Sequence, residues 1–187
     1  MPELLNIASI ICLIPNFSFL PSFSFTQLLE SLHFDHKFKS GRLTQLFGQS
    51  PYNYGTVLHN PSNFSDNRYV REIFEFVNQH FQSLHLNSCL INYYPGLQSS
   101  MPEHADDETC ICENSFIVTI SLGTSRRMFF RDSLKSESLC SVWLRDGSIL
   151  LFPKQSQHRF THAIPSVFDT DPYDYSPRIS ATFRKLK

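Results

Sequence analysis

The chain has 187 residues, a formal net charge of −1, and 41% hydrophobic against 18% charged residues. This length and this apolar fraction favour one globular domain over residues 1–187 and exclude a disordered chain. Because the charges nearly cancel, there is no global basic field, and any contact with nucleic acid must use a local patch.

The cysteines and the N-terminal segment indicate a reducing compartment. Five cysteines, an odd number in a chain of this size, argue against a disulfide framework. Cys110 and Cys112 form a C-x-C motif without the further partners that a zinc site needs, so we interpret them as ordinary thiols. Residues 4–14 are apolar, but they are too few to span a bilayer and lack signal-peptide flanks. We expect an intracellular protein, cytoplasmic or nuclear, without membrane contact.

The first half of the chain predicts strands and two helices that pack on a sheet. Residues 10–14 form an apolar strand candidate that a proline ends, and residues 41–48 look extended. In residues 25–32 and 69–81, apolar side chains recur every three to four residues, which is typical of amphipathic helices.

Tyr52 and Tyr54 lie in an aromatic, turn-rich segment that continues to His59. Side chains at positions i and i+2 of a strand point to one face, so the two tyrosines can form a stacking wall for a planar base. The alternative is a hairpin with cross-strand aromatic packing, and the composition supports both interpretations equally.

The second half consists mainly of short strand candidates. We expect a hairpin in which Asp146-Gly147 is the turn between residues 142–144 and 148–152. Helices that come early, followed by many short strands, indicate an α+β domain with a β-sandwich or barrel core. The other strand candidates are residues 88–94, 116–122, 128–131, 159–164 and 178–184.

His104 and Asp106 are two residues apart, so both side chains can reach one metal ion from the same side. An H-x-D pair alone is a weak signal, because the chain contains eight histidines and many acids. For a third ligand we favour His162, which lies in an extended apolar run, over His158, which lies in a segment that resembles a loop. Two imidazoles and one carboxylate leave open coordination positions, as a non-haem iron(II) site for dioxygen requires.

Arg178 and Arg184 are separated by an even number of residues, so on a strand both point to one face. A buried guanidinium beside a metal site requires an anion, because an unpaired buried charge is costly. A dicarboxylate co-substrate meets this need if it chelates the metal at one end and pairs with Arg178 at the other. The alternative is a basic C-terminal tail, which explains Arg178 poorly because that residue lies outside the basic cluster.

Together these motifs resemble the AlkB-like family of Fe(II)/2-oxoglutarate dioxygenases, whose pattern is N-x-Y, H-x-D, a distal His and R-x-N-x-T-x-R. The resemblance covers residues 10–187, and the compact form is similar to the AlkB domains in replicases of some plant-infecting RNA viruses. Ser180 departs from the pattern, because many members have Asn there. The matching segments are Gly41-Arg42-Leu43-Thr44, Asn92-Tyr93-Tyr94-Pro95-Gly96, His104-Ala105-Asp106, Arg145-Asp146-Gly147, His162 and Arg178-Ile179-Ser180-Ala181-Thr182-Phe183-Arg184.

The resemblance implies a double-stranded β-helix (jelly-roll) core, N-terminal helices packed on one sheet, and a nucleotide-recognition lid. It also implies three sets of site residues. The iron ligands are His104, Asp106 and His162; the 2-oxoglutarate-binding residues are Asn92, Tyr94, Arg178, Ser180 and Arg184; the substrate-binding residues are Tyr52, Tyr54 and Glu108.

The activity that the resemblance implies is oxidative demethylation of N-methylated bases, such as 1-methyladenine and 3-methylcytosine, in RNA or single-stranded DNA. Fe(II), 2-oxoglutarate and O2 take part, and formaldehyde, succinate and CO2 are released. We expect the protein to act as a monomer on methylated RNA or DNA. Two alternatives remain: an oxygenase with a protein or lipid substrate, and a catalytically idle binding module, against which the intact ligand set argues.

Overall fold

The computed structural model describes residues 11–15, 21–54, 57–134, 138–167 and 177–187. No helix in these ranges is long and apolar enough to cross a membrane. In chain order the elements are β1 (Cys12–Ile14), α1 (Phe25–Glu30), β2 (His36–Lys37), β3 (Leu43–Gly48), β4 (Tyr52–Tyr54), β5 (Val57–His59), η2 (Phe64–Asp66), α2 (Arg68–His80), η3 (Gln82–Leu84), β6 (Ser88–Tyr94), β7 (Met101–His104), β8 (Phe116–Gly123), β9 (Arg126–Asp132), β10 (Ser138–Leu144), β11 (Ile149–Pro153), η4 (Lys154–His158), β12 (Phe160–Ile164) and β13 (Arg178–Arg184).

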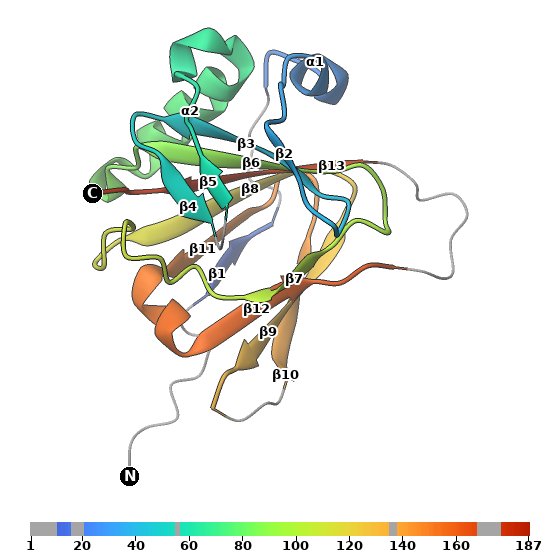
Figure 1. The fold of residues 1–187 in the computed structure, drawn as a ribbon, viewed down its shortest axis with the longest axis vertical. Helices are drawn as coiled ribbons and strands as arrows, with labels where there is room; N and C mark the ends of the chain where they lie inside the picture. Colours follow the sequence, from blue (N-terminus) through green and yellow to red (C-terminus); the bar gives the residue numbers. More distant parts are fainter. Residues whose placement is uncertain (1–10, 16–20, 55–56, 135–137, 168–176) are drawn as a thin grey trace.

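Two antiparallel sheets face each other and enclose a core (Figure 1). In the described part of the chain, the major sheet has the order β1-β11-β8-β13-β6-β3-β2 and the minor sheet the order β10-β9-β12-β7. Apolar side chains from both sheets pack together between them, among them Phe130, Phe152 and Ile164. This arrangement confirms the predicted jelly-roll core.

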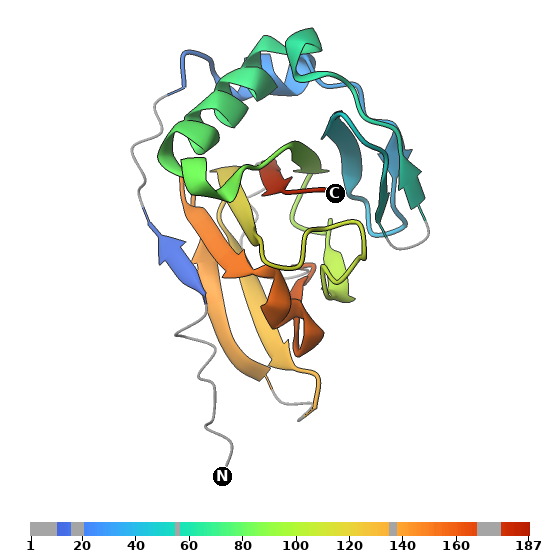
Figure 2. The same cartoon turned by 90° about the vertical axis from the view of Figure 1, so that its left-hand side faces the viewer.

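Both α-helices cover the outer face of the major sheet (Figures 1 and 2). Helix α2 begins after Asn67, whose side-chain oxygen accepts hydrogen bonds from the first-turn amides. Val70, Ile73 and Val77, spaced at three and four residues, are fully buried in one cluster with residues of the sheet. Burial of each such side chain stabilises the fold by about 1.5–3 kcal/mol. The buried face of the helix therefore needs apolar residues at helical spacing, and this is the pattern that the sequence shows.

The predicted hairpin around Asp146-Gly147 is wrong. Strand β10 pairs with β9, whereas β11 pairs with β8 and β1, so the turn carries the chain from the minor sheet to the major sheet. The turn is attached to β8, because the Gly147 amide donates to the Ser121 carbonyl and the Gly123 amide donates to Asp146. Gly147 has a φ of 69°, so the glycine suits this crossover turn as well as it suits a hairpin.

Strands β4 and β5 form a separate two-stranded hairpin, with Tyr52 opposite His59. The hairpin lies beside the open edge of the jelly roll, where a lid was expected (Figure 1). Of the predicted strand at residues 10–14, all but residue 10 lie in the described part. The predicted surface loop at residues 165–177 falls mostly on residues 168–176, which lie outside it.

Candidate metal and co-substrate site

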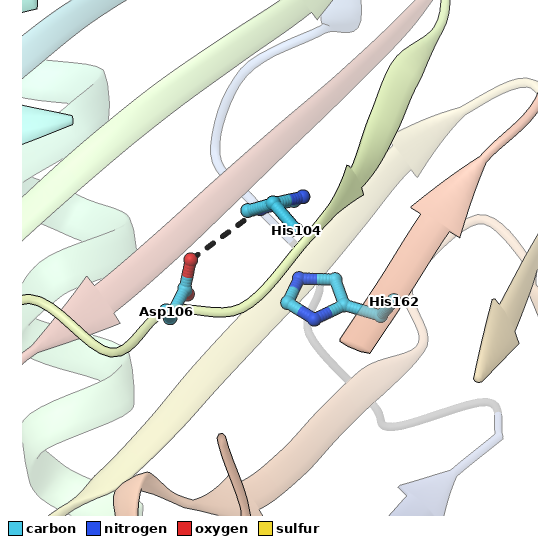
Figure 3. A group of neighbouring side chains, drawn as sticks. All are labelled: His104, Asp106 and His162. Atoms are coloured by element: carbon cyan, nitrogen blue, oxygen red, sulfur yellow. Dashed lines mark ion pairs between the residues drawn. The ribbon is translucent and has the colours of Figure 1, made fainter. Parts of the chain in front are cut away.

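His104, Asp106 and His162 come together between the two sheets. His104 is the last residue of β7, and the antiparallel pairing of β7 with β12 places His162 directly opposite it. One ligand atom from each of the three residues lies within 4.8 Å of the others. Figure 3 shows the three side chains converging, with Asp106 on the segment that follows β7. Strand register therefore brings together two histidines that are distant in sequence.

The His104 ring is held in one orientation by its neighbours. Its Nδ1 lies 2.9 Å from the Pro102 carbonyl oxygen. Because a carbonyl oxygen can only accept a hydrogen bond, Nδ1 carries the proton, and Nε2 of the neutral ring has the free lone pair. Nε2 lies 3.5 Å from Oδ1 of Asp106 and 2.8 Å from the Tyr54 hydroxyl. The nitrogen suited to bind a metal thus faces the carboxylate and receives a hydrogen bond from the lid tyrosine.

Asp106 is a buried carboxylate that two residues hold in place. Burial alone raises the pKa of Asp106, but Arg184 and the neighbouring histidines outweigh it and keep this pKa below its usual value. Nη2 of Arg184 donates to Oδ2 at 2.6 Å, while Oδ1 has no hydrogen-bond partner. The Asp106 amide donates to Oε1 of Gln157 at 3.1 Å. The free oxygen is therefore the one that faces His104.

Gln157 is a residue that the sequence motifs do not reveal. It is buried on η4, the short helix between β11 and β12, and no motif singles out a glutamine in that segment. The same helix ends with His158, the rival ligand, which is exposed and pairs with Glu113 instead of reaching the metal cluster. The preference for His162 over His158 therefore agrees with the geometry.

His162 is buried and lies beside His104, with ring centroids 4.3 Å apart. Burial, reinforced by His104, lowers the pKa of His162 to about 3, so the ring is neutral at pH 7. A neutral imidazole is the form that binds metals. Two imidazoles and an ionised carboxylate with an unpartnered oxygen fit a divalent cation with open coordination positions.

Arg178 provides a buried positive charge on the same strand as Arg184. Its Nη2 donates to Ser121 at 2.9 Å, and its guanidinium carbon lies 5.2 Å from the centroid of the Tyr94 ring. Its Nε and Nη1 have no hydrogen-bond partner, and burial lowers its pKa to about 10. A buried guanidinium with two unpartnered donors fits a carboxylate.

The cavity beside the metal cluster is walled by the other expected co-substrate residues, Asn92, Tyr94, Ser180 and Arg184. Arg42 also lines it and donates from Nη1 to Oδ1 of Asn92 at 2.6 Å. Ser180 stands in the wall, with its hydroxyl 3.3 Å from that of Thr182. Arg178 does not line this cavity, but its guanidinium lies against the ring of Tyr94, which does.

A second pocket, of about 530 Å³, adjoins the cluster on its lid side. Tyr54, His104 and Glu108 line it, and Tyr54 and His104 also line the inner cavity. Burial and the charge of Asp106 raise the pKa of Glu108. Tyr52, in contrast, is 1% exposed, lies 5.2 Å from the Arg184 guanidinium and does not line this pocket. The geometry thus brings Tyr54 and Glu108 to the pocket and leaves Tyr52 beneath it.

A jelly roll that holds two histidines and a carboxylate in its interior is the architecture of a non-haem iron(II) oxygenase. Residues 26–184 match the family described as the 2OG-Fe(II) oxygenase superfamily, and the chain belongs to this superfamily. Within it the chain is AlkB-like. The family assigns Fe(II), 2-oxoglutarate and O2 to the site.

The relatives support the AlkB-like assignment. The chain is 26% identical over 162 residues to alpha-ketoglutarate-dependent dioxygenase alkB homolog 3 of Homo sapiens. This match covers 81% of this chain and 54% of the human protein. The corresponding protein of Bos taurus is 24% identical over 163 residues. The chain therefore spans about half the length of the curated relatives it matches. The similarity to viral replicase domains stays a prediction.

A solved structure, that of OsALKBH1, shares the fold. It aligns with a TM-score of 0.58 over 94% of this chain and 97% of that chain, at 16% sequence identity. The match extends the jelly-roll assignment over nearly the whole chain.

Proposed function

We propose that the protein is an Fe(II)/2-oxoglutarate-dependent demethylase that removes N-methyl groups from bases in RNA or single-stranded DNA, such as 1-methyladenine and 3-methylcytosine. The observation that carries this proposal is the 530 Å³ pocket, which opens on His104 and has an aromatic wall at Tyr54. Its volume lies in the range of small-ligand sites, and a flipped or unpaired base needs both stacking and a group at the reacting end.

In this proposal His104, Asp106 and His162 hold Fe(II), which when bound supplies the oxidation of a C–H bond by O2. The chain's own residues prepare that site. Arg184 keeps Asp106 ionised and fixes Oδ2, so that Oδ1 is presented to the metal. The Pro102 carbonyl fixes the tautomer of His104, and burial keeps His162 neutral.

The co-substrate is bound by charge and shape. Arg178 pairs with the distal carboxylate of 2-oxoglutarate through its unpartnered Nε and Nη1, and Tyr94 lies against the same guanidinium. Asn92, Ser180 and Arg184 line the cavity that the candidate metal ligands also line, and in this proposal they contact the keto-acid end.

The substrate is held on the lid side. The Tyr54 ring stacks on the base, and Glu108 accepts or donates at the polar edge, which its raised pKa permits. Tyr52 supports the site from below through its contact with Arg184. The protein works as a monomer, and residues 1–187 form a single domain of this kind.

The test is a panel of oligonucleotides, RNA and DNA, that carry 1-methyladenine or 3-methylcytosine, incubated with Fe(II) and read by mass spectrometry. We expect a mass loss of one methylene equivalent and formaldehyde release that depend on 2-oxoglutarate and vanish in His104→Ala. Succinate formed without any loss of methyl from the panel would overturn the nucleic-acid assignment and favour a protein or lipid substrate. Fe(II) binding without succinate formation would favour an idle binding module.

A further inference from the structure

The outer face of the minor sheet carries aromatic and basic side chains that the active site does not use. Along β9, Met128 and Phe130 point into the core, so Arg127, Phe129 and Arg131 point outward. On the neighbouring strand β10, Trp143, the only tryptophan in the sequence, is 53% exposed. We call Arg127, Phe129, Arg131 and Trp143 the outer platform. Apolar side chains that gather on one exposed face of a protein are a mark of an interaction site.

The platform is organised by cross-strand contacts. Trp143 is the register partner of Arg127, and Ser141 is the partner of Phe129. The Arg127 guanidinium carbon lies 5.0 Å from the centroid of the Phe129 ring, and its Nε donates to the Ser141 hydroxyl at 2.8 Å. Trp143 and Phe129 are therefore diagonal neighbours on this face, and the Arg127 guanidinium lies against the phenyl ring.

A hollow of about 380 Å³ continues the platform toward β7. Phe129, Arg131 and Ala163 line it, and Glu103 lies at its far side. The Glu103 carboxylate is neutralised locally, because Arg131 lies 3.5 Å away and the Thr161 hydroxyl donates to it at 2.6 Å. The hollow thus offers an apolar floor and a guanidinium at its rim.

The platform and the proposed substrate pocket meet at β7. Glu103 faces the hollow, while its neighbours Pro102 and His104 line the pocket beside the metal cluster. β7 is also the edge strand of the minor sheet, so no further strand of the described chain separates the two sites. A chain lying across the platform can pass over this edge and enter the pocket.

We propose that the outer platform binds single-stranded nucleic acid on one side of the target base. This inference rests on the proposed function and adds a second binding surface to it. Aromatic rings on a sheet stack bases without sequence preference, and interleaved arginines contact phosphates and base faces. A binding surface of this kind is compatible with the net charge of −1, because base stacking supplies affinity that does not depend on a strong positive charge of the whole protein.

The test uses labelled, unmodified 12-mers of RNA and of DNA, and measures fluorescence anisotropy together with Trp143 emission. We expect binding to quench Trp143, with a logarithmic salt slope of about −1.4 for two phosphate contacts. Trp143→Ala, Phe129→Ala and Arg131→Gln each weaken binding, the aromatic changes by roughly tenfold. Arg71→Gln removes an exposed arginine from α2, behind the other sheet, and serves as the control. Comparing the affinities for the RNA and the DNA 12-mers identifies which nucleic acid the platform prefers.

Turnover separates this inference from the proposed function. On methylated 12-mers the platform variants raise KM and leave kcat unchanged, whereas on methylated trinucleotides both constants stay at the wild-type value. Platform-dependent binding without any demethylation would retain the platform and overturn the demethylase assignment. Unchanged affinity in all three platform variants would overturn the inference, as would concentration-dependent self-association that Trp143→Ala abolishes, which would assign the face to a second copy of the chain.

Discussion

The Arg184 guanidinium and the Asp106 carboxylate form a buried pair, joined by a 2.6 Å hydrogen bond from Nη2 to Oδ2. The last strand of the major sheet thereby fixes a candidate metal ligand that lies on the segment after β7. Oδ2 of Asp106 is thus hydrogen-bonded, whereas Oδ1 has no hydrogen-bond partner. We therefore expect this ion pair to couple metal binding to folding.

Replacing Arg184 with Gln should destabilise the metal-free protein by about 3–5 kcal/mol, because it leaves Asp106 buried without its cation. It should also raise the pKa of Asp106, so that metal binding weakens further as the pH falls. Urea denaturation and calorimetric metal titrations at two pH values measure both effects. In an Arg184→Gln/Asp106→Asn double variant the losses should be less than additive. Additive losses would contradict the coupling.

Replacing Tyr54 with Phe should strengthen metal binding. The Tyr54 hydroxyl donates to Nε2 of His104, the nitrogen that a metal requires, so hydroxyl and metal compete for one lone pair. A net hydrogen bond is worth about 0.5–1.5 kcal/mol, which corresponds to a roughly two- to tenfold gain in affinity. Anaerobic Fe(II) titration measures this, and Tyr52→Phe, whose hydroxyl is not bonded to His104, is the matched control. Weaker binding in Tyr54→Phe would show that the hydroxyl supports the metal.

Replacing Arg178 with Gln should weaken 2-oxoglutarate binding while leaving metal affinity unchanged. A hydrogen bond to a charged group is worth about 1.5–3 kcal/mol, so the loss of even one should weaken binding by roughly 10- to 150-fold. Calorimetric titration of the metal-loaded protein with 2-oxoglutarate measures it, and Arg145→Gln, an exposed change, is the control. Equal affinity in both variants would remove Arg178 from the co-substrate site.

Replacing Gln157 with Leu should lower both stability and metal affinity, although Gln157 belongs to no motif. The change leaves the buried Asp106 amide without its acceptor, at a cost of about 1–3 kcal/mol. Gln155→Leu alters the same short helix at an exposed residue and should have little effect. If the two variants bind metal equally well, Gln157 has no positioning role.

His59 should make the lid hairpin sensitive to acid. It is 1% exposed, and burial lowers its pKa despite Asp35, whose carboxylate lies 3.5 Å away. With a folded pKa below the unfolded value of about 6.5, the stabilisation is complete above that pH and is lost as the pH falls below it. In denaturation between pH 7.5 and 5.5, His59→Asn should lose less stability than the wild type. Parallel profiles would contradict this.

The sequence alone determined the fold class, the helices and the order of the site motifs. Its helical spacing placed Val70, Ile73 and Val77 on a buried face, and the even spacing of Arg178 and Arg184 placed both on one side of β13. Both placements are local, because each follows from the repeat of a single helix or a single strand. Residues that are close in sequence, such as His104 and Asp106, can therefore be paired from their spacing.

Tertiary structure decided everything that depends on which strands pair. The Asp146-Gly147 turn connects two sheets instead of closing a hairpin, because the Gly147 amide donates to β8 and the Asp146 carboxylate accepts from it. Gln157 reaches Asp106, and Tyr52 lies under Arg184 and not in the substrate pocket, for the same reason. Strand register and packing between distant segments set these contacts, and one strand's sequence does not specify the identity of its partner.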